Sequence, residues 1–265
     1  RELVMTVQAP EPLYLASGYK NTYTGTYWEQ QGEEYNALEQ LEDSSISTTP
    51  YPMEQQERQQ YYRRFYGMET KTTTVTLADY YTKHLFTPPF QQTIMLEKDT
   101  TLELATSGAL ISSKALPPYV WYTQQYISWD YDNAYFLDAL RQAGQHPLPE
   151  AEISFHNLTA HLALPDTVTD RTIELTKSIT QQYSNNYDKL KAIEDYLIQF
   201  PYTLAPDTPP EDQDFVDYFL FHEQKGYCVY YATAMAVMGR ILGIPTRYVE
   251  GYITPSHPDS SGVYQ

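Results

Sequence analysis

The sequence predicts an α+β protein in which a mainly antiparallel β domain comes first and a helix-rich domain follows it. Short segments rich in threonine, aromatic and branched aliphatic residues, separated by proline, glycine and aspartate, fill the first half, which is typical of antiparallel strands. After Pro165 the apolar residues recur at helical spacing instead. The predicted domains are therefore residues 1–165 and residues 166–265.

The composition is that of a folded, acidic protein. Of the 265 residues 42% are hydrophobic, and 17 basic residues stand against 34 acidic ones, which gives a formal net charge of -17. Such a charge repels phosphate backbones, so we expect no nucleic-acid partner. The longest nearly uncharged apolar stretch, residues 229–239, is shorter than the about 20 residues that a bilayer requires, so no membrane span is expected within this chain.

Residue types alone predict the strands of the first domain. Residues 3–8 are mostly apolar or β-prone, and residues 23–28 are rich in aromatics and threonine, which indicates a short strand at a sheet edge. The same reasoning predicts further strands at residues 72–77, 93–96, 102–105 and 119–129.

Two segments interrupt this pattern. Residues 29–50 are acidic and rich in serine and threonine, so they are expected to form a loop that buries little apolar surface. Residues 53–66 are dense in Gln, Glu and Arg, which favour a solvent-exposed helix. Gly67 suits the left-handed conformation that ends such a helix.

The second domain is predicted to begin with two antiparallel helices. Asp166 or Thr167 is expected to cap the first helix, and residues 185–186 are expected to end it. The second helix follows directly and stops at residues 200–201, because proline lacks the amide that a helix needs. The apolar residues at helical spacing are Leu175, Ile179 and Tyr183 in the first helix and Leu190, Ile193 and Leu197 in the second.

A third helix is predicted at about residues 228–242, followed by a strand at residues 246–253. This helix is apolar on nearly all sides, so it is expected to be surrounded by protein. Its first residue, Cys228, is the only cysteine, which excludes an internal disulfide and a cysteine-rich zinc site.

The position of Cys228 favours a reactive thiol. Unpaired backbone amides and the helix dipole stabilise a thiolate at a helix N-terminus. Gly226 allows a sharp turn into the helix and a close approach of a substrate carbonyl, and the backbone at Gly226 and Tyr227 is expected to support an oxyanion. The alternative is that a lone cysteine is a small buried apolar residue.

Three segments around the thiol together resemble the core of the bacterial transglutaminase-like family. They are Gly226-Tyr227-Cys228, Arg-Ile-Leu-Gly-Ile-Pro at residues 240–245 and Arg-Tyr-Val-Glu-Gly-Tyr at residues 247–252, within a resemblance that runs from about residue 168 to residue 252. It implies a papain-like core that is incomplete at its C-terminus, with no metal and no cofactor. It also implies that Cys228 is the nucleophile of a Cys, His, Asp triad.

The resemblance implies that the histidine and the aspartate of the triad lie on strands after residue 252. The chain as given ends at Gln265 before either, so we expect it to be inactive alone and a longer native chain to be active. His222 is a candidate to line the cleft, although exposure in a loop explains it more simply, and His257 lies in a turn sequence that suits a base poorly. The remaining histidines, at positions 84, 146, 156 and 161, show no metal-ligand spacing.

The opening residues resemble, more weakly, the extracytoplasmic region of membrane-embedded members of the same family. The similarity rests on residues 7–15, on Tyr23 and on residues 25–28. It implies a place on the outer face of the bacterial cell membrane, with attachment through segments absent from this chain.

The predicted activity is that of a transglutaminase, peptidase or amidase on peptides or proteins, including ones linked to the cell wall. The alternative is a non-catalytic binding or scaffolding module with the same fold.

Overall fold

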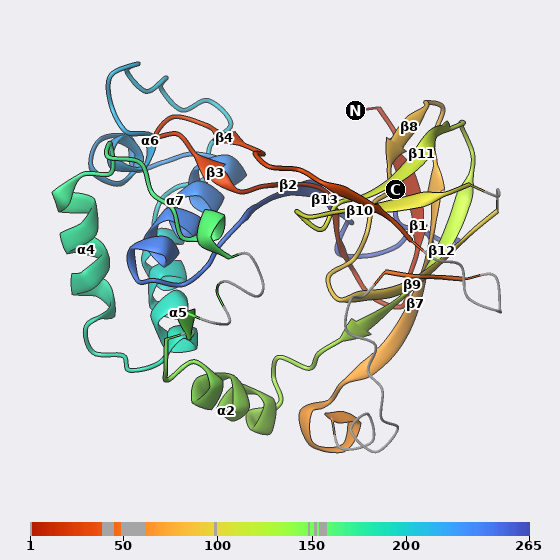
Figure 1. The fold of residues 1–265 in the computed structure, drawn as a ribbon, viewed down its shortest axis with the longest axis horizontal. Helices are drawn as coiled ribbons and strands as arrows, with labels where there is room; N and C mark the ends of the chain where they lie inside the picture. Colours follow the sequence, from red (N-terminus) through yellow and green to blue (C-terminus); the bar gives the residue numbers. More distant parts are fainter. Residues whose placement is uncertain are drawn as a thin grey trace. The chain divides into compact units, whose positions relative to one another are not determined.

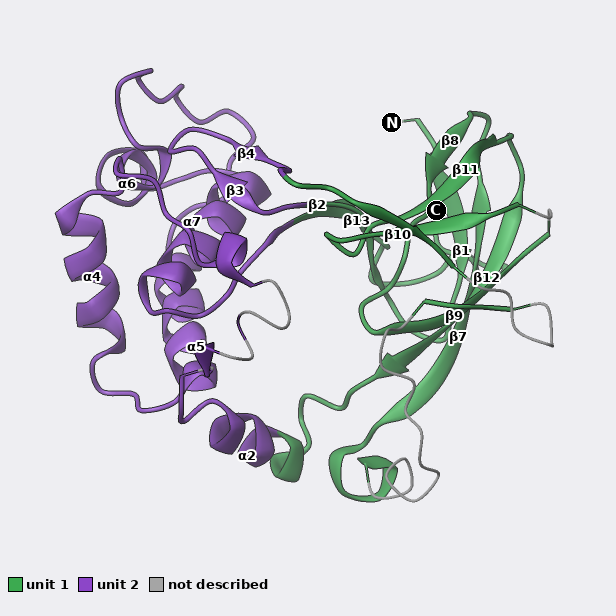
Figure 2. Cartoon of the chain, viewed as in Figure 1, with its two compact units in different colours: residues 1–19, 32–136, 249–265 green, residues 20–31, 137–248 purple. Residues whose placement is uncertain are grey.

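The computed structural model describes residues 2–38, 45–48, 62–97, 100–147, 149–150, 153 and 158–265. These residues form an α+β fold with antiparallel sheets, which confirms the predicted class (Figure 1). The chain divides into two compact units (Figure 2). Unit 1 comprises residues 1–19, 32–136 and 249–265, and unit 2 comprises residues 20–31 and 137–248.

The two units do not coincide with the predicted division at residue 165, because each is discontinuous along the chain. Residues 20–31 belong to unit 2, where Tyr23 and Trp28 are buried in a hydrophobic core of its own. Residues 249–265 belong to unit 1, where Val7 and Tyr264 exchange two backbone hydrogen bonds of 2.9 and 2.8 Å. A change in composition along the sequence cannot reveal segments that return to an earlier unit.

Unit 1 is built on two antiparallel sheets. The five-stranded sheet has the order β1-β7-β12-β9-β6, and the four-stranded sheet has the order β5-β10-β11-β8. Their strands are β1 (Met5–Gln8), β5 (Tyr35–Ala37), β6 (Ile46–Ser47), β7 (Glu69–Leu77), β8 (Thr82–His84), β9 (Gln91–Leu96), β10 (Leu102–Ala105), β11 (Leu110–Leu116) and β12 (Trp121–Ser128). A further pair is β2 (Tyr14–Lys20) with β13 (Tyr248–Ile253).

Most of the predicted strands are found. The segments predicted at residues 3–8, 72–77, 93–96, 102–105 and 119–129 correspond to β1, β7, β9, β10 and β12. Strand β11 was missed because serine and lysine interrupt its apolar residues. Ser112 in this strand is nevertheless fully buried, and its hydroxyl lies 3.0 Å from the hydroxyl of Thr100.

The two interrupting segments are only partly described. Strands β5 and β6 lie within the predicted loop at residues 29–50, while residues 39–44 and 49–50 are outside the described residues. Of the predicted helix at residues 53–66, residues 53–61 are outside the described part and residues 62–66 are helical. Gly67 has the predicted left-handed conformation, with φ of 63°.

Unit 2 is built from helices and one short hairpin (Figure 1). Helix α2 (Ala134–Ala143) leads into it from unit 1. Its other elements are β3 (Thr22–Tyr23), β4 (Trp28–Glu29), η1 (Thr159–His161), α4 (Asp170–Thr180), α5 (Asn186–Leu197), α6 (Phe215–Tyr218), the π-helical turn η2 (Phe219–Glu223) and α7 (Cys228–Ile241).

The predicted ends of the first helix are wrong. Helix α4 is capped by Thr169, whose side chain accepts a hydrogen bond from the backbone of Thr172. Residues 165–168 form a turn instead, closed by a 3.2 Å bond from the amide of Val168 to the carbonyl of Pro165. Asn185 caps the next helix, α5, rather than ending α4. A residue that can end one helix can equally begin another.

The buried residues of α4 are threonines, while the predicted apolar residues Leu175 and Ile179 are partly buried and pack against the core of unit 2. Thr172, Thr176 and Thr180 are buried. The hydroxyl of Thr176 donates to the carbonyl of Thr172 at 2.7 Å, and that of Thr180 donates to the carbonyl of Thr176 at 2.8 Å. Because each hydroxyl is satisfied within the helix, threonine can be buried here without leaving a polar group unpaired.

The other two predicted helices are confirmed. Ile193 and Leu197 of α5 are buried, as the helical spacing predicted, and Pro201 follows the end of that helix. Helix α7 runs from Cys228 to Ile241, and its central residues are buried, including Ala234 and Val237. Its first residue, Cys228, is exposed, as is Ala232 one turn later.

Candidate active site

Cys228 is the first residue of α7, and its thiol is exposed. Tyr227 precedes it in an extended conformation, with φ of -117° and ψ of -177°, and no side chain among the described residues caps the helix. The amides of a first helical turn lack partners within the helix and carry the positive end of its dipole. The thiol therefore lies in solvent at an electropositive helix end, and the interpretation as a buried apolar cysteine does not apply.

Gly226 is held by the backbone of a distant segment. Its amide donates to the carbonyl of Pro201 at 3.2 Å, and its carbonyl accepts from the amide of Thr203 at 2.8 Å. A Cβ atom at this glycine would lie 2.6 Å from Cγ of Tyr230, so glycine is needed for this ring to pack against the backbone. The amide that was predicted to support an oxyanion is thus already bonded. That role stays a prediction for Tyr227, whose ring meets Tyr230 edge-on at 5.2 Å.

A tyrosine pair lies beside the start of α7. The hydroxyl of Tyr231 lies 2.8 Å from the carbonyl of Phe200 and 3.0 Å from that of Pro201, so it bonds to the chain just after α5. The ring of Tyr202 stacks on the ring of Tyr231, with centroids 6.4 Å apart and an angle of 15° between the planes. Residues 200–203 are therefore fixed along the beginning of the helix that carries the thiol.

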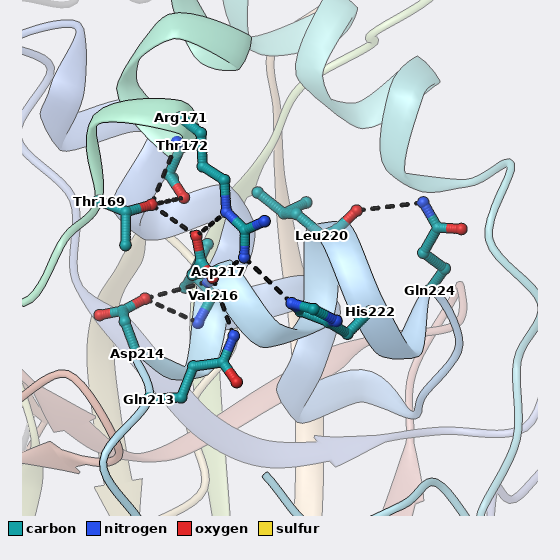
Figure 3. A network of polar contacts seen from close by, with 10 residues as sticks. All are labelled: Thr169, Arg171, Thr172, Gln213, Asp214, Val216, Asp217, Leu220, His222 and Gln224. Atoms are coloured by element: carbon teal, nitrogen blue, oxygen red, sulfur yellow. Dashed lines mark hydrogen bonds and ion pairs between the residues drawn. The ribbon is translucent and has the colours of Figure 1, made fainter. Parts of the chain in front are cut away.

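His222 belongs to a different set of contacts (Figure 3). Its Nε2 lies 3.1 Å from Nη2 of Arg171, and its ring stacks on Tyr218 at 5.9 Å. Because a guanidinium can only donate, Nε2 accepts in this contact. The side chain is exposed, as the simpler explanation predicted. Its part in lining a cleft stays a prediction.

Arg171 joins His222 to a buried carboxylate. Figure 3 shows its guanidinium between Asp217 and His222. It donates to both carboxylate oxygens of Asp217, which also accepts from Thr169 at 2.6 Å and from Gln213 at 3.0 Å. The hydrogen bonds from Arg171 hold the pKa of Asp217 below its ordinary value, against the opposing effect of burial.

Asp214 immediately precedes the short helix α6 that contains Asp217, and its pKa is shifted in the opposite direction to that of Asp217. Its Oδ1 accepts from the amides of Val216 and Asp217 at 3.0 and 3.1 Å, which makes it the cap of α6. Its Oδ2 accepts from the hydroxyl of Tyr23 at 3.1 Å and from that of Thr167 at 3.2 Å. Burial raises its pKa, against the lowering effect of these hydrogen bonds. An aspartate just before a helical segment is a capping signal, so this residue could have been found from the sequence.

Arg240 is the residue of this unit that sequence reasoning missed most clearly. It is 3% exposed, and its guanidinium donates to backbone carbonyls and a hydroxyl rather than to a carboxylate. The acceptors are the carbonyls of Asn21, Ala163 and Thr246, each at 2.7 Å, and Oγ1 of Thr246 at 3.1 Å. Burial lowers its pKa to about 10, so the group remains charged at neutral pH.

The other described histidines lie elsewhere. Nδ1 of His257 is 3.1 Å from the hydroxyl of Ser256 in an exposed turn of unit 1. His161 is half-buried in unit 2, and burial together with Arg247 and Arg240 lowers its pKa. His156 lies outside the described residues. In the part of the chain that the structure describes, no hydrogen bond joins Cys228 to a histidine.

No group of three or more His, Cys, Asp or Glu side chains among the described residues is placed to hold a metal ion. No helix among them has the length and apolar character that a membrane span needs.

Sequence comparisons give the relatives of this chain. Residues 173–264 match the family model of the transglutaminase-like superfamily. YebA of Bacillus subtilis is 30% identical over 268 residues, which cover 97% of this chain and 33% of YebA, so the chain spans about a third of that relative. A protein-glutamine gamma-glutamyltransferase of Pseudomonas aeruginosa is 51% identical over 53 residues, which are 20% of this chain and 8% of that protein.

A comparison with solved structures gives the same fold. The periplasmic domain of TgpA from Pseudomonas aeruginosa, in a crystal structure bound to ethylmercury, has a TM-score of 0.65 and 19% identity. The match covers 99% of this chain and 80% of the TgpA chain, and at this identity it shows the fold alone. The family resemblance of the segments around Cys228 is confirmed, because the matched residues 173–264 include Cys228 and are similar to the transglutaminase-like superfamily.

Proposed function

We propose that this chain supplies Cys228 as the nucleophile of an acyl-transfer enzyme that acts on peptide or protein amides outside the cytoplasmic membrane of a bacterium. The observation that carries the proposal is the exposed thiol at the uncapped start of a helix whose later turns are buried. A thiolate at a helix N-terminus is stabilised by the free amides and by the dipole. The glutamyltransferase relative supports a glutamine side chain as the acyl donor.

The proposed reaction has two steps, formation of a thioester and its resolution, and in each step one bond to the acyl carbon forms and another breaks. The sulfur of Cys228 attacks the amide carbonyl carbon, and the electron pair of the C=O bond moves to oxygen. The C–N bond then breaks, the nitrogen takes a proton from a general acid, and a thioester remains. An amine or water attacks the thioester carbon and gives a proton to a general base, the C–S bond breaks, and the sulfur leaves as the thiolate. We assign neither the acid nor the base to a described residue.

The location outside the membrane is also part of the proposal. The TgpA structure that shares this fold is that of a periplasmic domain, and the opening residues resemble the extracytoplasmic region of membrane-embedded family members. We propose that this chain is likewise an extracytoplasmic part, attached to the membrane by segments outside the residues given. Fusion of a periplasm-active reporter enzyme to the chain within its full-length protein would test this.

A non-catalytic binding module is the competing function. One observation favours it, because the histidine nearest to Cys228 in sequence bonds to Arg171 and the described residues give the thiol no base. A module of this kind would bind peptides without turning them over. Turnover by the full-length protein therefore separates the two functions.

The decisive experiment uses the full-length protein, its Cys228→Ala variant and Val229→Ala as the matched control in the same helical turn. Each is incubated with a fluorescent primary amine and a glutamine-containing peptide, and both amine incorporation and ammonia release are measured. Loss of a nucleophile typically costs several orders of magnitude, so we expect turnover by wild type and Val229→Ala and none by Cys228→Ala. Equal turnover by Cys228→Ala would refute the thiol mechanism. Peptide binding without turnover by any of the three would favour the binding module.

Binding of ethylmercury would measure, independently of turnover, whether the Cys228 thiol of this chain is accessible. Organomercury ions bind thiolates, which are soft ligands. Cys228 is the only cysteine, so one equivalent is expected to bind to wild type and none to Cys228→Ala. Titration followed by intact-mass spectrometry would detect this, and slow or absent labelling of the native chain would contradict an accessible thiol.

A further inference from the structure

Three large apolar side chains are exposed in the segment that follows α5. Ile198 is 67% exposed, Tyr202 is 64% exposed and Leu204 is 77% exposed. They lie within seven consecutive residues of unit 2. Large apolar side chains that gather on a surface commonly mark a place where another molecule binds.

The backbone brings this segment to the beginning of α7. Tyr202 forms a parallel bridge with Gly226, and the amide of Thr203 bonds to the carbonyl of Gly226. Cys228 is only two residues further along the chain. The exposed tyrosine is therefore anchored next to the residue from which the thiol-bearing helix begins.

Helical spacing places Tyr231, on which Tyr202 stacks, on the same face of α7 as Cys228. Tyr231 lies one turn after Cys228, and residues three apart on a helix are neighbours, with Cβ atoms about 5–6 Å apart. Helical side chains lean toward the N-terminus, so we expect the ring of Tyr231 to lie toward the turn that holds Cys228. Tyr202 stacks on this ring. The exposed ring and the exposed thiol thus share Tyr231 as a common neighbour.

Tyr231, on which Tyr202 stacks, is held in place before any ligand arrives. The hydroxyl of Tyr231 bonds to the carbonyls of Phe200 and Pro201, and its ring meets the buried ring of Phe219 edge-on at 5.3 Å. Only Tyr202 is then left with much of its surface exposed. A ring that is fixed in advance loses little conformational freedom on binding, which favours affinity.

We propose that Tyr202, with Leu204 beside it in the chain, forms a subsite for an aromatic side chain of the substrate next to the amide that Cys228 attacks. This subsite rests on the proposed function, and it names the class of peptide that the enzyme prefers. A further ring can continue the parallel stack that Tyr231 and Tyr202 begin, because the two ring planes are only 15° apart. Leu204 offers an aliphatic side chain of high exposure to the same bound ring.

The test uses thiol alkylation of this chain, so it does not depend on turnover. The rate of modification of Cys228 by iodoacetanilide is divided by the rate with iodoacetamide, and the same ratio is measured for N-acetylcysteine. An aromatic pair of this kind corresponds to a preference of about 2-fold to 10-fold, which is the expected excess of the ratio for the native chain over the ratio for the free thiol.

Variants identify the ring that is responsible. Tyr202→Ala should reduce the ratio to that of N-acetylcysteine, while Tyr202→Phe should retain it because the ring remains. Leu204→Ala should reduce it in part. Tyr27→Ala is the matched control, because Tyr27 is a similarly exposed tyrosine of unit 2, on the hairpin, and the ratio should be unchanged. Circular dichroism of each variant verifies the fold.

The outcomes separate this proposal from the proposed function. A ratio equal to that of the free thiol in wild type, or one that Tyr202→Ala leaves unchanged, would overturn the subsite even if the full-length enzyme is active. A larger preference for a cationic haloacetamide of the same size would overturn the aromatic class. A preference that depends on Tyr202, in a protein without turnover, would support the subsite while the proposed activity fails.

Discussion

The two ends of helix α7 differ in their exposure and in their hydrogen bonds. At its start Cys228 is exposed and no described side chain caps the helix. Near its end Arg240 is buried and bonded to three backbone carbonyls and one hydroxyl. The same helix therefore combines a reactive, solvated end with a fixed, buried one.

This difference shows how a reactive group can be held in place without being buried. Arg240 ties α7 to the hairpin at Asn21, to the chain at Ala163 and to Thr246, and its guanidinium lies over the ring of Trp28 at 4.9 Å. The free amides at the start of α7 can be satisfied by water, so the open end costs little stability. We infer that the buried end fixes the helix and that the open end is available for chemistry.

The largest loss of stability is expected for Arg240→Ala, which removes the buried side chain near the end of α7. It would remove the donor from the buried carbonyl of Asn21 and from the partly buried carbonyls of Ala163 and Thr246, and it would remove the guanidinium from Trp28. A buried acceptor without a partner costs about 1–3 kcal/mol, and the two partly buried ones cost less because water can reach them, so we expect a loss of about 2–4 kcal/mol in the free energy of unfolding. Urea denaturation followed by circular dichroism at 222 nm measures it.

Arg240→Lys is the matched control for this change. An ammonium keeps the charge but cannot reach acceptors on three separate segments in the fixed geometry of a guanidinium, so most of the loss should remain. If lysine restored full stability, the charge alone would matter and the anchoring role of Arg240 would be refuted.

The second test concerns the steric fit beside the open end. In Gly226→Ala the added Cβ would lie 2.6 Å from Cγ of Tyr230 and 2.8 Å from its Cβ, at the base of the side chain where it cannot move aside. Overpacking of this kind costs about 1–3 kcal/mol in the free energy of unfolding. Gly18→Ala is the control, because its Cβ would meet nothing closer than 3.6 Å. Equal stability of the two variants would contradict the packing of Tyr230 on Gly226.

The third test compares two aspartates three residues apart. Asp217→Asn removes the charge that Arg171 contacts, and we expect a fall in Tm of about 3–6 °C. Asp214→Asn should cost less, because an asparagine oxygen still caps α6 and the hydroxyl of Tyr23 still bonds to the carbonyl of Gly25. Thermal unfolding at neutral pH measures both, and a larger loss for Asp214→Asn would contradict the assignment.

The pH dependence of this third test follows from the direction of the shift. The pKa of Asp217 in the folded chain is below its ordinary value of 3.8, so the unfolded chain binds a proton first as the pH falls. The stability from this group is complete above the ordinary value and is lost as the pH falls toward the lowered one. The difference in stability between wild type and Asp217→Asn should therefore be constant between about pH 5 and 7 and decrease below about pH 4.

The elements that could be predicted from the sequence are those whose buried residues are apolar. Strands β7, β9, β10 and β12 and helices α5 and α7 all carry such residues at the spacing of their class. Prediction failed where polar residues are buried, as at Thr176 in α4 and Ser112 in β11, because their hydroxyls are satisfied by partners that residue type does not reveal. The segments that belong to the other unit than their neighbours in sequence, residues 20–31 and 249–265, were missed because residue type does not reveal the distant segments that they contact.

The candidate site shows the same limit. The glycine two residues before Cys228 and the apolar run after it predicted a thiol at a helix start, and the structure places it there. Most contacts of Gly226 and Arg240 could not be predicted, since their partners are mainly backbone amides and carbonyls, which nearly every residue type has. The partner of His222 was missed because Arg171 precedes it by 51 residues.

The smallest expected effect on stability is at Cys228 itself. The thiol is exposed, and no hydrogen bond joins it to another described residue, so Cys228→Ala removes no buried contact. Alanine is also the residue that a helix favours most. We expect the free energy of unfolding to change by less than about 0.5 kcal/mol, while reaction with iodoacetamide disappears entirely because the chain has no other cysteine. Urea denaturation and intact-mass analysis of the same samples measure both quantities. A loss as large as that of Arg240→Ala would mean that the open end of α7 contributes to the fold, and the contrast between the two ends would no longer hold.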